Sequence, residues 1–587
     1  MKHYRILFAF SLIASLGFVA GCDDPFNPEE NFRMNIDQVI SRPQYAEGLL
    51  DYAYTQLPYR TFRFDEVATD DAVSNQISNT YRAMATGAWT ALSNAQDMWT
   101  VCYRSIMNIN DFLTIVDKVN WKESTPALNV AFKQRLTGEA YALRGVMKYF
   151  LLQNHAGLGT DGTLLGIPEY NDFVSSLEDF SAPRQTFAQS VESADQDFDL
   201  ALQYLPMDYV DVAEVPAQFT DLKLTADQYN IAFGSGFTQR ISGRIVQAYK
   251  ARLALLAASP RFNEAGSASL WETAANANAK VLSDLGGLEY FDPNGNLFWL
   301  KAQVEDSDLG LGNKKETNEI IWRREMQDIN TWETDNYAPT VYGHGRINPT
   351  QNFVDAFPMK NGYPIDNASS EYDAQHPYAN RDPRLAQIVV YDMSKEWNQT
   401  IHILDGTTND GIDKTEYSTR TGYYMRKHLR EDVSVQTGKT STQKHIIPII
   451  RATEIYLNYA EAANEAWGPD GKGSNGYSAR EVIAAIRKRA GISQPDAYLE
   501  GIASKEDMRK LIRNERRIEL SFEGARFWDL RRWKEDLTEP ANGIRLEDGV
   551  YRTFKVEDRN FKPYMVYGPI PFNEVLKFGF VQNQGWD

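Results

Sequence analysis

Apolar residues recur at helical spacing along much of the first half of the chain and again near its C-terminus. In Trp99–Val116, for example, Ile106, Ile109 and Phe112 fall on one face of a helix. Such segments follow one another in pairs, which favours stacking of the tetratricopeptide type, although the strict repeat signature is not visible. We therefore predict a mainly α fold built from tetratricopeptide-like helix pairs. The segments with helical spacing are Trp99–Val116, Phe132–Leu152, Thr186–Leu205, Arg244–Ala258, Trp271–Leu285, Thr453–Trp467, Ala479–Ala490 and Lys505–Phe522.

Residues from about 290 to 450 have a different composition, rich in Gly, Pro, Asn, Asp and Tyr. Their short apolar runs, Glu319–Trp322 and Gln387–Tyr391, are typical of strands rather than helices. We predict a loop-rich region with a few short strands, inserted between the helical parts. Loops held on a rigid scaffold are where binding residues concentrate. The predicted parts are a helical scaffold over 36–289 and 451–535, the insert over 290–450, and a C-terminal extended segment over 536–587.

The N-terminus has the features of an export signal. Lys2 and Arg5 precede the apolar run Ile6–Ala20, whose 15 residues are too few to span a bilayer core of about 30 Å. The run ends in Val-Ala-Gly-Cys, which resembles a bacterial lipobox and predicts a signal peptide over 1–21 and lipidation of Cys22. Two or more acyl chains anchor a protein stably. The acidic stretch 22–35 then serves as an extended tether; the alternative is an ordinary secretory signal with an incidental cysteine.

Charge, cysteine content and the catalytic motifs that are missing from the sequence limit the classes of function that it favours. The chain has 61 Lys and Arg against 79 Asp and Glu, and its net charge of −18 argues against a nucleic-acid partner. Cys102 would have no partner for a disulfide if Cys22 is lipidated, and we expect it to be a small buried residue. The sequence contains no HExxH, paired CxxC, Walker A or GxSxG motif, so it predicts no cofactor and no metal-dependent catalysis.

Several motifs, in the same order along the chain, resemble those of the SusD/RagB family. One such block would be weak evidence, whereas a full series from the lipobox to the last residues is specific. In the final block, Gln584 stands where proline is usual. The matching blocks are Gly138–Arg144 with Tyr149-Phe150, Pro349–Gly362, Asn380–Leu385, Arg451–Glu465, Ile486–Gly491, Arg513–Leu520, Glu523–Trp533 and Pro569–Trp586.

This resemblance implies an α-helical fold with tetratricopeptide-like pairs and a function in nutrient uptake. Family members are lipid-anchored proteins of the outer membrane, facing the extracellular side. They bind nutrients, usually glycans, and cover a SusC-like TonB-dependent transporter without catalysing a reaction. The alternatives are an adaptor or peptide-binding subunit of the same kind of complex, and a surface enzyme that acts on glycans.

The charged hallmark near the C-terminus admits two interpretations. Arg513, Glu515, Arg516, Glu519 and Glu523 place opposite charges three and four residues apart on one helix. They could form a basic binding patch, but we favour ion pairs that fix this helix against its neighbours. The Asn-Arg-Asp-Pro-Arg turn at 380–384 is also expected to be structural, because proline restricts the backbone conformation of the residue before it.

The ligand site is predicted from the placement of aromatic rings. A sugar lays its C–H face on Trp or Tyr while its hydroxyl groups need polar partners alongside. Two loop segments, Thr69–Asp97 and Gln327–Ile347, combine both kinds of residue. The predicted ligand-binding residues are Trp89, Trp332, Tyr337, Tyr342, Asn75, Asp71 and Arg82.

Overall fold

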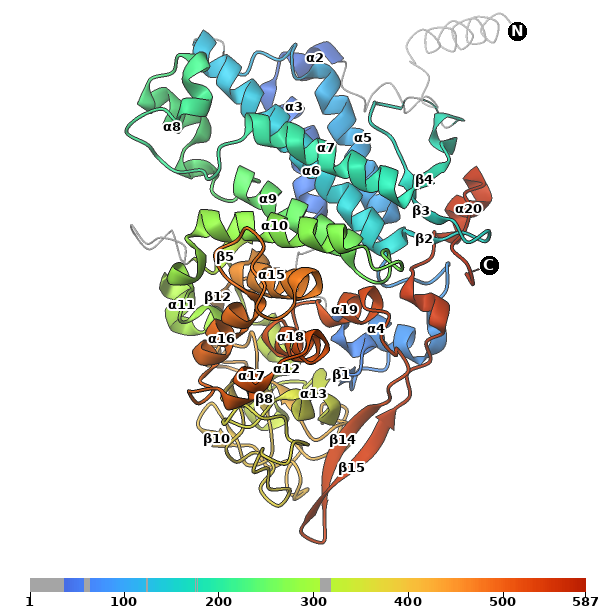
Figure 1. Ribbon diagram of the computed structural model, residues 1–587, viewed down its shortest axis with the longest axis vertical. Helices are drawn as coiled ribbons and strands as arrows, with labels where there is room; N and C mark the ends of the chain where they lie inside the picture. Colours follow the sequence, from blue (N-terminus) through green and yellow to red (C-terminus); the bar gives the residue numbers. More distant parts are fainter. Residues whose placement is uncertain are drawn as a thin grey trace, which may run out of the picture.

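The structure is a computed structural model that describes residues 36–57, 64–122, 125–174, 176, 178–306 and 318–586. The predicted signal peptide 1–21, the tether 22–35 and the lipidation site Cys22 lie outside these residues. Figure 1 shows a layer of long helices in the upper part of the view and the loop-rich insert in the lower part. The prediction of a mainly α fold with tetratricopeptide-like helix pairs is confirmed.

The long helices pack in neighbouring pairs. Along the chain, α3 packs on α5, α6 on α7, and α9 on α10, while α10 also contacts α15 from the C-terminal part. The predicted helical segments agree with the observed bounds to within a few residues, except that α6 extends beyond both predicted ends. Helix α3 (Pro43–Gln56) lies outside the predicted segments. The helices that match predicted segments are α5 (Trp99–Ile115), α6 (Pro126–His155), α7 (Phe187–Tyr204), α9 (Gly243–Ala258), α10 (Ala268–Leu285), α15 (Ala452–Trp467), α16 (Ala479–Ala490) and α18 (Lys505–Glu519).

Local sequence signals explain where several of these helices begin and end. Thr186 accepts a hydrogen bond from the backbone of Gln189, whose side chain accepts in return, so α7 begins with a capping box. Gly286 ends α10 in the left-handed conformation at φ 101°. Gly145 marks the crossing of α6 and α7, because a Cβ there would lie 2.6 Å from the Phe198 ring. Small residues at crossings thus allow the paired helices to approach closely.

Shorter helices complete the scaffold and the insert. Cys102 on α5 is fully buried, as expected of a small core residue.

Within the described residues, no helix is both long and apolar enough to cross a membrane. The shorter α-helices are α2 (Ile36–Ile40), α4 (Thr80–Ala83), α8 (Ala226–Phe233), α11 (Lys301–Asp306), α12 (Thr331–Asn336), α13 (Gln351–Ala356), α14 (Arg384–Ile388), α17 (Ala497–Gly501), α19 (Arg526–Arg532) and α20 (Phe572–Phe578).

The strands form small antiparallel sheets. The predicted strand Glu319–Trp322 corresponds to β5 (Ile320–Arg323), which pairs with β13 (Pro448–Arg451), so an early part of the insert is held to its last residues. The run Gln387–Tyr391 is mostly not a strand, because its first residues belong to α14. The remaining pairs are β1 (Ala72–Ser74) with β7 (Ile347–Pro349), β6 (Gln327–Ile329) with β12 (Gln443–His445), β8 (Val389–Val390) with β11 (Tyr424–Met425), β9 (Lys395–Glu396) with β10 (Gln399–Thr400), and the sheet of β2 (Gly157–Leu158), β3 (Leu164–Pro168) and β4 (Arg184–Thr186).

The segment 536–587, predicted to be extended, contains regular structure. Its strands β14 (Ala541–Glu547) and β15 (Val550–Glu557) form a hairpin that projects at the lower end of the molecule in Figure 1. The chain then returns to the helical layer, where Trp586 packs against Trp89 with ring centroids 4.8 Å apart. The last residues therefore close a core that begins near the N-terminus.

Candidate functional site

Strand pairing brings the two predicted loop segments together. Ser74 in β1 lies opposite Ile347 in β7, so the residues after β1 and those before β7 share one surface. The turn over 338–346 runs beside α12, since His344 N donates to Thr334 O at 2.8 Å and the next residues continue the pattern. Segments about 270 residues apart thus form one site.

Asn75 connects three loops at this surface. Its Nδ2 donates to the carbonyl oxygens of His344 at 3.0 Å, Gly345 at 2.9 Å and Ser418 at 3.2 Å. Its Oδ1 accepts from Arg346 Nη1 at 3.3 Å. The Asn75 amide therefore orients the Arg346 guanidinium and, through Ser418, positions the loop that carries Tyr417.

The surface contains both aromatic rings and polar groups. The His344 imidazole stacks on Tyr417 with centroids 4.4 Å apart and planes 24° from parallel, and the Arg346 guanidinium lies 5.2 Å over the same tyrosine ring. Tyr342 is 56% exposed, and its hydroxyl accepts from Gln436 Nε2 at 3.1 Å. We call Asn75, Tyr342, His344, Arg346 and Tyr417 the β1–β7 surface.

Two buried carboxyl groups support the turn beneath Tyr342. Glu396 Oε2 accepts from the backbone N–H of Ala338 at 3.2 Å, and Asp410 accepts from the backbone N–H of Thr340 at 2.8 Å and from its hydroxyl at 2.5 Å. Burial raises the pKa of Glu396 to about 7. These contacts fix the turn from its buried side and leave the Tyr342 ring exposed to solvent.

Arg82 lies in the same region but is engaged in an ion-pair cluster. Its Nε donates to Glu557 Oε2 at 2.8 Å, and Glu557 also receives Arg420 at 2.7 Å and Arg559 at 2.8 Å. Burial disfavours the charge on Glu557, but these guanidinium groups outweigh it and hold the pKa of Glu557 below its usual range. Arg82 therefore joins α4 to β15, and a ligand would have to compete with this pairing.

The prediction that Trp89 offers a ring face to a ligand is wrong. Trp89 is 3% exposed and packs against the rings of Phe527 and Trp586, and the Arg531 guanidinium lies 5.1 Å from its centroid. Its Nε1 donates to Asn94 Oδ1 at 2.9 Å. The loop position suggested exposure, but the returning C-terminus covers the ring.

Trp332 and Tyr337 are also core residues, which corrects the same prediction for both. They are 5% and 1% exposed and belong to the apolar core of the insert. The Tyr337 hydroxyl donates to the Arg430 carbonyl at 2.5 Å and accepts from Trp397 Nε1 at 2.8 Å. Neither ring has a face free for a sugar, because α12 turns both inward.

Asp71 serves the scaffold rather than a solvent-exposed site. It is 1% exposed, and its Oδ1 accepts from Arg517 Nε at 2.7 Å. The neighbouring Asp70 pairs with both Arg517 and Arg526 at 2.8–2.9 Å. These pairs join the residues before β1 to α18 and α19, so a hydroxyl of a bound ligand could not reach the carboxylate of Asp71.

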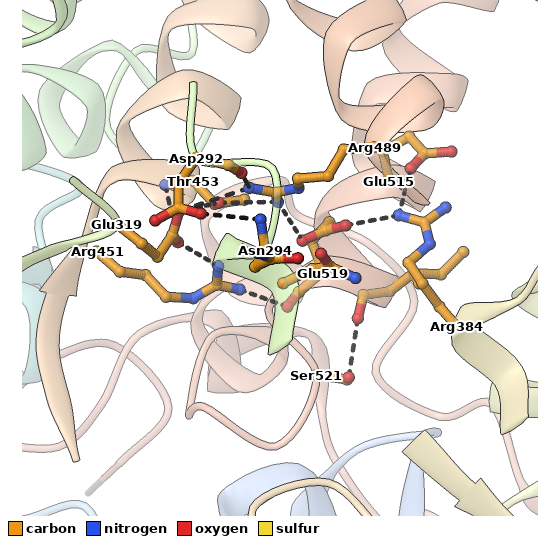
Figure 2. Close-up of polar contacts among 12 residues, drawn as sticks. Asp292, Asn294, Glu319, Arg384, Arg451, Thr453, Arg489, Glu515, Glu519 and Ser521 are labelled. Carbon is orange, nitrogen blue, oxygen red and sulfur yellow. Dashed lines mark hydrogen bonds and ion pairs between the residues drawn. The ribbon is translucent and has the colours of Figure 1, made fainter. Parts of the chain in front are cut away.

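The charged hallmark forms buried ion pairs, as we favoured. Figure 2 shows Arg384 directed at Glu515 and Glu519, with Nη1 to carboxylate distances of 2.8 and 2.9 Å. On the other side, Arg489 Nη2 lies 2.9 Å from Glu519, and Arg451 Nη1 lies 2.7 Å from Glu319. All of these side chains are buried, so this network is structural and the interpretation as a binding patch is wrong.

The sequence analysis missed His344 and Tyr417 as members of the surface. His344 lies within a segment that was singled out, but only its stacking on Tyr417 indicates its position. Tyr417 lies in a polar stretch of the insert with no motif around it. No sequence pattern indicated that this stretch reaches β1.

A cleft among the described residues is lined by side chains of α6, α9, α15, α18 and α19. It has a volume of about 130 Å³ and is lined by Tyr149, Arg252, Asn458 and Trp528, among others. Small-molecule sites usually measure roughly 300–1,000 Å³. The cleft is too small for an oligosaccharide. The β1–β7 surface is the candidate site because it combines the exposed Tyr342 with oriented polar groups.

Comparison with known proteins identifies the family. Residues 314–586 match the profile of the SusD family, and residues 27–221 match a second profile described as starch-binding and associating with the outer membrane. The chain belongs to the SusD/RagB family. The predicted family resemblance is thus confirmed. A search of the curated proteins found no match.

Solved structures of SusD-like proteins share the fold over more than nine-tenths of the chain. A SusD-like protein from Bacteroides fragilis has a TM-score of 0.69 at 22% identity and covers 94% of this chain and 100% of its own. A SusD-like carbohydrate-binding protein from the same species has a TM-score of 0.67 at 19% identity, with 92% and 99% covered. A SusD superfamily protein from Parabacteroides distasonis has a TM-score of 0.59 at 16% identity, with 92% and 99% covered.

Proposed function

We propose that this protein is a non-catalytic, glycan-binding lipoprotein of the cell surface. It captures an oligosaccharide at the β1–β7 surface and passes it to a SusC-like TonB-dependent transporter in the outer membrane. Membership of the SusD/RagB family supports the assignment to nutrient uptake. The composition of the β1–β7 surface supports the assignment of the ligand.

The observation that carries the proposal is the combination of an exposed ring with oriented polar groups. Tyr342 presents its ring to solvent, and the stacked pair of His344 and Tyr417 adds a second flat surface nearby. Asn75 and Arg346 supply amide and guanidinium groups for hydroxyls. Rings provide contact area at a low cost in conformational entropy, and the polar groups set the orientation.

The exposure of Tyr342 fits capture followed by transfer. An exposed surface can contact a stretch of polysaccharide without enclosing its ends. Because only a few groups take part, we expect dissociation constants on the order of micromolar to millimolar, that is, about −8 to −4 kcal/mol. Such a ligand dissociates readily, as transfer to a transporter requires.

A lipid on Cys22 would keep the body close to the membrane. The tether 22–35 can extend by at most about 3.3–3.6 Å per residue, or roughly 50 Å in total. This reach confines the protein to the neighbourhood of a membrane transporter. Replacing Cys22 with Ser should release the protein from the membrane fraction, which fractionation and immunoblotting would detect; retention of the variant would contradict the anchor.

Binding can be tested by affinity electrophoresis of the unlipidated chain against a panel of polysaccharides. We expect retardation by a subset of the panel, and we expect Tyr342→Ala to weaken it at least tenfold. Tyr290→Ala is the matched control, since Tyr290 is 59% exposed and lies outside the β1–β7 surface. Equal retardation of wild type and Tyr342→Ala would reject this site. Failure of every polysaccharide to retard the wild type would reject glycan binding and favour a peptide ligand.

A further inference from the structure

Arg346 differs from the other arginines around the β1–β7 surface. Arg82 and Arg420 both pair with Glu557. By contrast, no carboxylate among the described residues lies within ion-pair distance of the Arg346 guanidinium, although the chain as a whole carries a net charge of −18. The Asp335 carboxylate is 3.9 Å from His344 Nδ1; burial raises its pKa, while the nearby charges of His344 and of Arg346 act in the opposite direction without a direct ion pair to Arg346.

The Arg346 side chain is held in place without a direct ion pair to any carboxylate that the structure describes. Tyr417 supports the face of the guanidinium at 5.2 Å, and Asn75 Oδ1 accepts from Nη1 at 3.3 Å. The backbone is fixed as well, because Arg346 N donates to the Asp335 carbonyl at 2.8 Å. The other guanidinium N–H groups have no acceptor among the residues that the structure describes. Arg346 is therefore a half-buried cation, already oriented, with free donors.

A guanidinium in this state is suited to a planar anion. Its donors form a rigid fork that matches the two oxygens of a carboxylate, which a lysine ammonium cannot do. Stacking on an aromatic ring leaves the edge of the fork available, since the contact uses only the face. The rings of Tyr342 and His344 lie on the same surface and could hold the sugar to which such a carboxylate is attached.

We infer that the β1–β7 surface selects glycans that carry a carboxylate, as uronic acids do, and that Arg346 determines this selectivity. The inference rests on the proposed glycan-binding function and specifies its ligand class. Arg346 binds the carboxylate, Asn75 and Tyr417 position the guanidinium, and the exposed ring contacts the pyranose face. Attraction between exposed charges weakens as salt is added, so this selectivity should fall with ionic strength.

The test compares acidic polysaccharides with their own neutral forms. Oligomers of polygalacturonate, alginate and hyaluronan are titrated into the unlipidated chain by calorimetry, each beside a form whose carboxylates have been reduced to alcohols. Dextran sulfate beside dextran gives a sulfate arm. We expect at least one uronic-acid oligomer to bind tenfold or more tightly than its reduced form.

The variants Arg346→Gln, Arg346→Lys and Arg552→Gln locate the effect. Arg346→Gln should weaken the binding of acidic oligomers at least tenfold and leave the affinity for the reduced forms within twofold of wild type. Arg346→Lys should keep part of the affinity for acidic oligomers that Arg346→Gln loses. Arg552 lies on the hairpin strand β15 and is exposed, so Arg552→Gln should change nothing.

Three outcomes would overturn the inference. The first is a wild type that binds reduced or neutral glycans as well as acidic ones, the second is an Arg346→Gln variant that loses both forms equally, and the third is preference for dextran sulfate alone. In each of these cases glycan binding itself stands. Absence of binding to every glycan, neutral ones included, would instead refute the proposed function.

Discussion

Glu396 couples the turn beneath the β1–β7 surface to pH, and Glu396→Gln should remove this dependence. The Glu396 side chain is 2% exposed, and its Oε1 has no hydrogen-bond partner among the described residues. Burial raises its pKa from 4.5 to about 7, although Arg426 nearby favours the charged form. At pH values above 7 the folded protein therefore holds an ionised carboxylate in an apolar setting, next to the backbone of Ala338.

The magnitude follows from the difference between the folded and unfolded pKa values. The folded state binds the proton more tightly, so the free energy of unfolding falls as pH rises from about 4.5 through 7. At about 1.36 kcal/mol per pKa unit, the full loss is roughly 3 kcal/mol. Between pH 5.5 and 8.5 the loss is about 2 kcal/mol. A glutamine stays neutral throughout this range, so the free energy of unfolding of the variant should lack this pH-dependent loss.

Differential scanning calorimetry at pH 5.5, 7.0 and 8.5 measures the effect. At about 2.1 cal/mol/K of unfolding entropy per residue, 2 kcal/mol corresponds to a Tm change of roughly 2 °C in a chain of this length. The Tm of Glu396→Gln minus that of wild type should therefore rise by about this amount from the lowest to the highest pH. Glu416→Gln, at an exposed position in the same insert, is the control and should show a constant difference. A constant difference for Glu396→Gln as well would refute the reasoning.

Three further substitutions test the packing by urea denaturation. Trp586→Ala should lower the free energy of unfolding by about 3–5 kcal/mol and shift tryptophan emission to the red. Phe572→Ala, at an exposed site, should lower it by under about 1 kcal/mol. Equal losses for the two variants would contradict closure of the core by the C-terminus. Gly145→Ala should lower the free energy of unfolding by about 1–3 kcal/mol, because the added Cβ meets the Phe198 ring. Gly48→Ala, with open space around it in α3, should raise the free energy of unfolding by about 0.5–1 kcal/mol. If both substitutions changed the free energy of unfolding in the same direction, the close helix crossing would be refuted. Arg384→Met should lower the free energy of unfolding by about 3–5 kcal/mol, because the buried Asp382 carboxylate loses its ion-pair partner while Glu515 and Glu519 keep only Arg487 and Arg489; a loss under about 1 kcal/mol would show that the network adds little.

The sequence by itself determined the helices and the family. Apolar spacing located segments such as Arg244–Ala258 and Ala479–Ala490 almost to the residue, because an amphipathic helix needs only its own residues to define a face. Capping residues such as Thr186 act within one turn and are equally local. The charges of the C-terminal hallmark also indicated that this helix is held by ion pairs, but their partners, such as Arg384 and Arg489, lie on other elements and were decided by the tertiary structure.

Only the tertiary structure decided which aromatic rings reach the surface. Trp89 and Tyr342 both lie in loops rich in polar residues, yet the C-terminal Trp586 covers the first and nothing in the described structure covers the second. The candidate site depends on Tyr417, which stacks on His344 from a distant part of the insert. Burial and stacking are set by contacts between segments far apart in the chain, and the pattern of any one segment carries no information about what folds onto it.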